Sequence, residues 1–127
     1  MKFESIYTKG KGRGRPMGFP TINLKVPEDF ELEEGVYAAK ITIENNVFKG
    51  ALHFGPTPTF NEQEKSLEVY LIGLLESELT KYGLVNMDEK IIEVEILKHL
   101  RSIVKFRSVK KLIAQIEEDV KQIKKLI

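Results

Sequence analysis

The segment GVYAAKITIENNVFKGALHF, residues 35–54, carries the clearest structural pattern in the chain. Apolar residues alternate with other residues over Gly35–Glu44 and again over Val47–Phe54, which is the pattern of half-buried strands. The apolar positions change parity near Ala39, so we expect the first strand to change face there. Between the two strands, Asn45 and Asn46 both tolerate a positive φ, and they predict a tight hairpin turn.

Similar alternation continues on both sides of this hairpin. It predicts further strands at Lys2–Tyr7, Thr21–Val26, Ser66–Leu74 and Ile91–Leu97. In the third of these, one face is formed by Leu67, Val69 and Leu71, and the opposite face by Glu68, Tyr70 and Ile72. Several short strands with no helix between them predict an antiparallel sheet that closes into a barrel. Residues 75–90 have weak periodicity, and we expect them to form a loop.

The C-terminal segment has a helical period instead. Its apolar residues recur in steps of three and four and form one stripe, made of Val109, Leu112, Ile113, Ile116, Val120, Ile123 and Ile127. Ser108 is a suitable N-cap, and Lys124 and Lys125 near the end suit the helix dipole. We expect this helix to pack on the β structure and to cover an end or a flank of it. A stripe left exposed in the folded monomer would instead favour a protein-interaction domain.

Length and composition limit the remaining possibilities. The chain has 127 residues, which predicts one compact domain over residues 1–127. It contains no cysteine, which excludes disulfides, thiolate catalysis and cysteine-ligated metal centres, and two histidines are too few for a histidine-rich metal site. No apolar run is long enough to cross a membrane, and the charged first residues do not form a signal peptide. We therefore expect a cytoplasmic protein with no membrane partner.

Charge is balanced over the whole chain but unevenly distributed along it. The net charge of +1 does not suggest a nucleic-acid-binding protein. Residues 1–25 hold six basic residues and one acidic residue, and residues 97–111 hold six basic residues and no acidic residue. Two basic segments that meet in space can surround an anionic ligand, or both can be ordinary solvated surface.

The most unusual segment is GKGRGRPMGFPTIN, residues 10–23. Its first glycines alternate with basic residues, in the order Gly10, Lys11, Gly12, Arg13, Gly14 and Arg15. Glycine lets backbone N–H groups approach phosphate oxygens closely, and basic side chains add charge-assisted hydrogen bonds. The segment matches neither a P-loop nor a dinucleotide-binding fingerprint. A nucleotide phosphate loop and a plain basic hairpin loop therefore both remain open.

Three polar residues on predicted strands are candidates for chemistry. Thr21 and Asn23 point to the same face of an extended segment, and their oxygen atoms can hold Mg²⁺ if nucleotide phosphates complete its shell. Glu68 on a partly closed barrel face can act as a general base. On pattern alone, all three can equally be ordinary surface residues.

Two loop segments near these strands can border a ligand. In LRSIVKF, residues 100–106, Arg101 and Phe106 can clamp a planar anionic ligand, or they can cap the core. The segment GPTPTF, residues 55–60, is stiffened by two prolines. It can form the wall of a pocket or simply join two strands.

Taken in order, these segments resemble the riboflavin kinase (flavokinase) family, in particular the kinase module of bacterial riboflavin kinase/FAD synthetases. The resemblance covers nearly the whole chain, through GRG and GFPTIN, then GVYAAKI, GPTPTF, SLEVYLIGL, LRSIVKF and LIAQIEEDV. It implies a mainly β fold, namely a six-stranded antiparallel Greek-key barrel with a C-terminal α-helix. It also implies transfer of the ATP γ-phosphate to the 5′-hydroxyl of riboflavin, which gives FMN and ADP.

The resemblance further implies the roles of single residues. Nucleotide binding is implied for Gly10, Gly12, Gly14, Arg15 and Thr21. The Mg²⁺ that accompanies ATP would be held by Thr21 and Asn23. Glu68 would be the catalytic base, and Arg101 and Phe106 would bind the flavin. Riboflavin or FMN and ATP or ADP would then be the partners of a monomer that binds no nucleic acid.

The chain departs from the family pattern at several positions. Tyr70 stands where the family usually has histidine, and Gly73 stands where it has aspartate. The segment Arg101–Ile103 reads Arg-Ser-Ile where Arg-Pro-Glu is common, and the usual segment before the next strand is replaced by Asn86–Lys90. These departures bear on flavin affinity and on the flap over the flavin more than on the metal site. No adenylyltransferase module is present in the sequence, so we do not expect FAD synthesis.

Two other functions remain as alternatives on the same barrel. The first is a non-catalytic flavin- or nucleotide-binding module, and flavin binding without turnover would favour it. Thr21, Asn23 and Glu68 together argue against this alternative, because binding alone needs no base. The second is a small-barrel RNA-binding protein, and salt-sensitive RNA binding without flavin binding would favour it. The net charge near zero argues against this second alternative.

Overall fold

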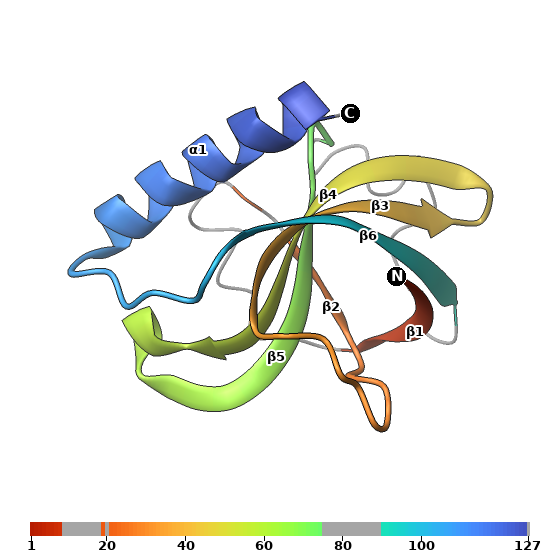
Figure 1. The fold of residues 1–127 in the computed structure, drawn as a ribbon, viewed down its shortest axis with the longest axis horizontal. Coiled ribbons are helices and arrows are strands. Elements are labelled where there is room, and N and C mark those ends of the chain that lie inside the picture. The colour runs from red at the N-terminus through yellow and green to blue at the C-terminus, as the bar shows by residue number, and fades with distance from the viewer. Residues whose placement is uncertain (9–18, 20, 75–89, 127) are drawn as a thin grey trace.

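The computed structural model describes residues 1–8, 19, 21–74 and 90–126, and these residues form a β-barrel with one α-helix against its outside (Figure 1). In chain order the elements are β1 (Lys2–Thr8), β2 (Thr21–Leu24), β3 (Gly35–Ile43), β4 (Asn46–Thr57), the 3₁₀ helix η1 (Pro58–Phe60), β5 (Glu62–Leu71), β6 (Ile91–Arg101) and α1 (Val109–Leu126). The strands close in the order β1-β2-β5-β4-β3-β6, and every neighbouring pair is antiparallel. The expected six-stranded antiparallel barrel with a C-terminal helix is confirmed.

The interior of the barrel is filled by the apolar face of each strand. Along β5 the side chains of Leu67, Val69 and Leu71 are buried, whereas Glu68 and Tyr70 between them lie on the outer face. This confirms the predicted alternation. Burial of each aliphatic side chain contributes roughly 1.5–3 kcal/mol. The largest side chains that are fully buried are Ile41, Ile43, Leu52, Leu67, Val69, Ile92, Val94 and Ile123.

The hairpin between β3 and β4 is present, but its turn lies one residue earlier than predicted. The turn residues are Glu44 and Asn45, with φ values of 47° and 70°, and Ile43 pairs with Asn46. The prediction was wrong because side chains alternate every two residues. If the turn moves by one residue, each residue of β3 pairs with a residue two positions further along β4. The same side chains then still face inward. The alternation therefore cannot distinguish the two registers.

Strand β3 does not change face near Ala39. Tyr37, Ala39 and Ile41 all point into the barrel, in one unbroken alternation. The misleading signals were Val36 and Ala38, which are 5% and 0% exposed although they lie on the opposite, outer face. A strand that is buried on both faces loses its apolar–polar alternation, and the sequence alone does not show which face is the interior.

Helix α1 begins and lies as the sequence predicted. Ser108 caps it, because its side-chain oxygen accepts a hydrogen bond from the backbone N–H of Lys111 at 3.2 Å. The helix lies across the outside of the barrel (Figure 1), and Ile123 in its apolar stripe is fully buried. The sequence did not predict that Asp119 would lie on the same packed face, where it is 2% exposed. No helix in the described ranges has the length and apolar character needed to cross a membrane.

Candidate functional site

The pairing of the strands places three of the candidate residues, Asn23, Glu68 and Arg101, in one row on the outer face of the barrel. Asn23 of β2 lies opposite Glu68 of β5, and Glu68 lies opposite His53 of β4. The row continues through Val36 of β3 to Arg101 of β6. Side chains that lie directly opposite on neighbouring strands have Cβ atoms about 4.5–5.5 Å apart. The register therefore brings Asn23 and Glu68 together, although 45 positions separate them in the sequence.

A cavity that is partly open to solvent lies between this face of the barrel and helix α1. Its apolar wall is formed by Phe19, Val36, Ala51, Phe60, Leu112 and Ile116. Its polar lining is formed by Thr21, His53, Thr57, Glu62, Glu68, Tyr70, Arg101 and Asp119. Although more of these residues are polar, most of the surface that they expose to the cavity is apolar. An apolar cavity with polar groups at its edge is typical of a site for a small organic molecule.

A second hollow, also partly open to solvent, adjoins the first and is much more polar. It is lined by Thr8, Asn23, Leu24, Lys25, Val26, Glu64, Lys65, Ser66 and Leu67, together with the shared residues Thr57, Glu62 and Glu68. Glu68 therefore lies where an apolar cavity meets a hollow lined by charged and hydroxyl groups. That position allows its carboxylate to face two ligands of different polarity.

Thr21 and Asn23 lie together on the outer face of β2, as predicted. The residues that alternate with them, Ile22 and Leu24, are 7% and 2% exposed and belong to the barrel interior. Hydroxyl and amide oxygens are ligands that Mg²⁺ accepts, but two of them fill only part of its six-fold shell. Among the described residues no cluster of three or more His, Asp or Glu side chains is arranged to hold a metal. The donor set thus fits a metal that arrives with phosphate oxygens rather than one bound by protein alone.

His53 is a site residue that sequence reasoning did not single out. Its Nε2 lies 3.0 Å from the carbonyl oxygen of Gly55, so the ring donates this hydrogen bond. Burial lowers the pKa of the His53 imidazole, and the charge of Arg101 lowers it further. Hydrogen bonds to backbone carbonyls and the carboxylate of Glu34 act in the opposite direction without reversing the shift. His53 is therefore a neutral ring beside Glu68 near neutral pH.

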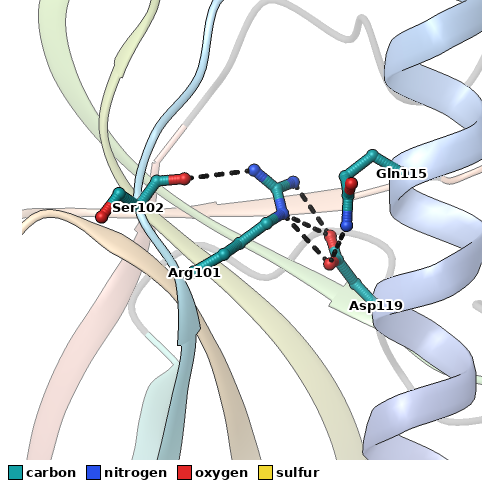
Figure 2. A network of polar contacts seen from close by, with 4 residues as sticks. All are labelled: Arg101, Ser102, Gln115 and Asp119. Atoms are coloured by element: carbon teal, nitrogen blue, oxygen red, sulfur yellow. Dashed lines mark hydrogen bonds and ion pairs between the residues drawn. The ribbon is translucent and has the colours of Figure 1, made fainter.

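Arg101 lies at the end of the row and is bound to helix α1 (Figure 2). Its Nε atom donates to Asp119 Oδ1 at 3.0 Å and to Oδ2 at 3.1 Å, and its Nη2 atom donates to Oδ2 at 2.9 Å. Gln115, one turn earlier in the helix, donates to Asp119 Oδ1 at 3.0 Å. The structure thus puts Arg101 at the cavity wall, with its guanidinium directed at a buried carboxylate. The flavin contact expected of Arg101 stays a prediction.

Phe106 lies beside Arg101 but does not line the cavity. The guanidinium carbon of Arg101 is 5.6 Å from the centre of the Phe106 ring. The backbone N–H of Phe106 donates to Thr59 Oγ1 at 3.0 Å, and Lys105 donates to Asn61 at 3.1 Å. These bonds tie the segment before α1 to the turn after β4, which itself walls the cavity. The flavin contact of Phe106 also stays a prediction.

Part of the predicted nucleotide site falls outside the described residues, namely Gly10, Gly12, Gly14 and Arg15. The nearest described residues on the two sides of that segment both lie at the site. Thr8 pairs with Asn23 and lines the polar hollow. Phe19 lines the cavity, and its ring lies edge-on to Tyr70 with the ring centres 5.3 Å apart.

Comparison with known proteins identifies the family. The family model described as riboflavin kinase (flavokinase) matches residues 1–127. The chain belongs to the riboflavin kinase family. The resemblance carried by GFPTIN, SLEVYLIGL and LRSIVKF is thereby confirmed.

The similar proteins of known function are longer than this chain. The chain is 33% identical over 116 residues to the bifunctional riboflavin kinase/FMN adenylyltransferase of Haemophilus influenzae, which covers 91% of this chain and 35% of that protein. It is 34% identical over 113 residues to the RNA-binding riboflavin kinase RibR of Bacillus subtilis, covering 88% of this chain and 45% of that protein. The chain thus spans about a third to a half of the length of these relatives.

A solved structure agrees on the fold. The crystal structure of riboflavin kinase from Trypanosoma brucei matches 98% of this chain and 76% of that one, with a TM-score of 0.60 and 15% sequence identity. At this identity the likeness supports the barrel architecture alone. The site residues of this chain must therefore be argued from their own geometry.

Proposed function

We propose that this chain transfers the γ-phosphate of ATP to the ribityl 5′-hydroxyl of riboflavin and releases FMN and ADP. The observation that carries the proposal is the position of Glu68, which lines both the apolar cavity and the polar hollow. Membership of the riboflavin kinase family supports the reaction class. If the organic substrate occupies the apolar cavity and the phosphate donor the polar hollow, Glu68 would lie between them, where a base can accept the proton of the attacking hydroxyl.

In this proposal the flavin ring occupies the cavity under α1. Its apolar faces would pack between the barrel wall and residues such as Leu112 and Ile116 of the helix. The ribityl chain would then lead toward Glu68. The phosphates of the nucleotide would lie in the polar hollow, next to Asn23 and the end of β1. A phosphoryl-transfer site acts mainly by positioning its substrates and neutralising charge, and such an arrangement provides for both.

Glu68 would accept the proton of the 5′-hydroxyl as the hydroxyl oxygen attacks the γ-phosphorus. The bond from that phosphorus to the β,γ-bridging oxygen breaks, and ADP leaves. Thr21 and Asn23 would hold the Mg²⁺ that accompanies the nucleotide and neutralises part of the charge on its phosphates when bound. Neutral His53, on the other side of Glu68, places no positive charge beside the base, so it does not weaken the base by holding the carboxylate ionised.

The deciding experiment is a riboflavin phosphorylation assay with ATP and Mg²⁺, in which FMN is resolved by chromatography. The wild type is expected to form FMN only when Mg²⁺ is present. Glu68→Gln should slow turnover by about 10²–10⁴-fold while riboflavin and nucleotide still bind. Glu93→Gln is the matched control, because Glu93 is an exposed carboxylate on the outer face of β6. Equal turnover by Glu68→Gln and Glu93→Gln would remove Glu68 from the mechanism.

We further propose that residues 1–127 act as one domain, as a monomer in the cytoplasm, on free flavin and nucleotide. One relative is named as RNA-binding, so the absence of a nucleic-acid partner needs its own test. A fluorescence titration with labelled RNA at low and high salt supplies it, because binding through phosphates weakens steeply with salt. Salt-sensitive RNA binding without flavin binding would replace the kinase proposal by the RNA-binding alternative. Flavin binding without FMN formation would favour the non-catalytic module.

A further inference from the structure

Within the part of the chain that the structure describes, Arg101 and Asp119 form a bidentate ion pair between the barrel and helix α1. Arg101 is the last residue of β6, and Asp119 lies in the second half of α1 (Figure 2). Three hydrogen bonds of 2.9 to 3.1 Å join the guanidinium to both carboxylate oxygens. The Asp119 side chain is only 3% exposed and that of Arg101 is 19% exposed. A charge pair that is this enclosed has to be well formed, because each unpaired charge would be costly to bury.

This pair fixes the position and orientation of α1 on the barrel, which the apolar contacts of the helix leave free. Ile123 holds α1 against the barrel by apolar burial, which has no preferred direction. A helix held only in this way can slide or rotate at small cost. A planar guanidinium that binds both oxygens of a carboxylate allows one distance and one orientation. Gln115 holds the carboxylate from its own helix and so fixes its rotamer.

The position that the pair fixes is that of the cavity roof. Leu112 and Ile116 of α1 face Val36 and Ala51 of the barrel across the cavity, and Arg101 and Asp119 themselves form part of its wall. The width of the space for a planar ring therefore depends on where α1 lies. The Nε and Nη2 donors of Arg101 are directed at Asp119, and Nη1 lies 3.4 Å from the carbonyl oxygen of Ser102. The guanidinium is thus directed at the protein rather than at the ligand space.

We infer that Arg101 and Asp119 are positioning residues that set the affinity for riboflavin by fixing helix α1 over the cavity, without touching the phosphoryl group that is transferred. This inference rests on the proposed function for the identity of the ligand. The inference gives Asp119 a role in positioning α1. It also means that Arg101 affects the affinity for flavin only through the helix. Because Glu68 lies three strands away from Arg101 in the row, the transfer step itself should not depend on the pair.

The test compares Arg101→Met, Asp119→Asn and the double variant Arg101→Met/Asp119→Leu. Steady-state assays give kcat and separate KM values for riboflavin and for MgATP, and quenching of riboflavin fluorescence gives its Kd. Each single variant should raise the KM and Kd for riboflavin by about 10- to 100-fold, since coupling between a remote contact and a binding site typically changes affinity by about 5- to 150-fold. The kcat and the KM for MgATP should stay within about twofold of the wild-type values.

The double variant is the control for a loss of folding in the single variants. Removing one member of a buried pair leaves an unpaired charge, whereas replacing both by apolar side chains often preserves the fold. Its riboflavin Kd should rise no further than that of either single variant, because the two residues act through one contact. The matched controls are Glu118→Gln, an exposed carboxylate of the same helix, and Lys49→Met, an exposed cation on β4. Both should bind riboflavin like the wild type.

Hydrogen exchange of the α1 amides provides a readout independent of catalysis. Faster exchange in α1 of both single variants, with unchanged exchange in β3 and β4, is expected if the pair holds the helix. A rise in riboflavin KM in Arg101→Met but not in Asp119→Asn would overturn the inference in favour of direct contact between Arg101 and the flavin. A fall in kcat with unchanged riboflavin Kd would overturn it as well. A wild type that binds riboflavin but forms no FMN would overturn the proposed function and leave the Kd test of the pair intact; a wild type that does not bind riboflavin would overturn both.

Discussion

Glu68 owes its surroundings to the pairing of β5 with two different strands. On one side the register places Asn23, with a polar hollow around it, and on the other side it places His53, next to an apolar cavity. Neither neighbour is close to Glu68 in sequence. The carboxylate therefore acquires a chemical setting that an isolated strand with the same residues would not have.

At Asn23 we predict an effect on the nucleotide rather than on the flavin. Asn23→Ala removes an amide oxygen beside the polar hollow. It should weaken Mg²⁺-dependent ATP binding by at least the roughly 10–100-fold that loss of an outer-shell partner of a metal costs. Titration with MgATP and with riboflavin separately measures this, and Asn46→Ala in the β3–β4 hairpin is the control. A larger loss of riboflavin affinity than of ATP affinity would show that the metal assignment is wrong.

At His53 we predict a pH dependence of stability. The folded protein keeps the pKa of His53 below its usual value of 6.5, mainly through burial. Between that lowered pKa and 6.5, the unfolded chain binds a proton that the folded protein does not, so the free energy of unfolding falls as the pH drops through this window. His53→Asn removes the titrating group, and its stability should fall less between about pH 7.5 and pH 5.5. Urea unfolding at several pH values measures both proteins. Parallel pH profiles would contradict a buried, neutral His53.

At the scale of elements, the β3–β4 hairpin shows a conflict between local preference and register. Glu44 occupies the first turn position with a φ of 47°, a conformation that costs a residue other than glycine or asparagine roughly 1–2 kcal/mol. Its carboxylate forms an ion pair with Lys90 at 3.4 Å, which is exposed on the Glu44 side and contributes little. The turn residue is therefore set by the pairing of the strands and not by its own propensity.

We accordingly predict that Glu44→Asn stabilises the protein by about 0.5–1 kcal/mol, since asparagine is favoured at this turn position. Glu44→Ala is the control, because it removes the same ion pair with Lys90 but keeps the strain of a positive φ. Thermal unfolding should rank asparagine above glutamate, and glutamate at or above alanine. If alanine stabilised as much as asparagine, the ion pair with Lys90 rather than the backbone would be the unfavourable feature.

The apolar stripe of helix α1 also contains a buried acidic residue. The sequence predicted its start, its cap and the side that faces the barrel. Asp119 lies three residues after Ile116 and four before Ile123, so it occupies the stripe itself. An acid at such a position signals a buried partner, and that signal was available. The sequence did not show that this partner is Arg101, because the two residues are brought together only by the path that the chain takes between β6 and α1.

At the scale of the whole molecule, closing the barrel requires small residues where strands approach closely. Gly50 of β4 pairs with Ala39 of β3. A Cβ atom added to Gly50 would lie 2.8 Å from a methyl carbon of Val69 and 3.0 Å from a side-chain carbon of Ile41. Both neighbours are fully buried and have little room to move.

We predict that Gly50→Ala destabilises the protein by about 1–3 kcal/mol through overpacking. Urea unfolding of this variant and of Lys49→Ala, its exposed neighbour, measures the difference. Lys49→Ala should change the free energy of unfolding by less than about 0.5 kcal/mol. A neutral Gly50→Ala would mean that the interior adjusts at this point more easily than its close packing indicates.

By itself the sequence determined the six strands, the helix, the inward side of most strands and the family, since alternation, helical period and ordered motifs are local properties. It also suggested Thr21, Asn23 and Glu68 as candidates, from residue type and position in a strand. Only the tertiary structure decided the hairpin register, the double burial at Val36, and the meeting of Arg101 with Asp119. Each of these depends on contacts between segments far apart in the chain, and a pattern with a period of two residues is the same in every register that differs by two.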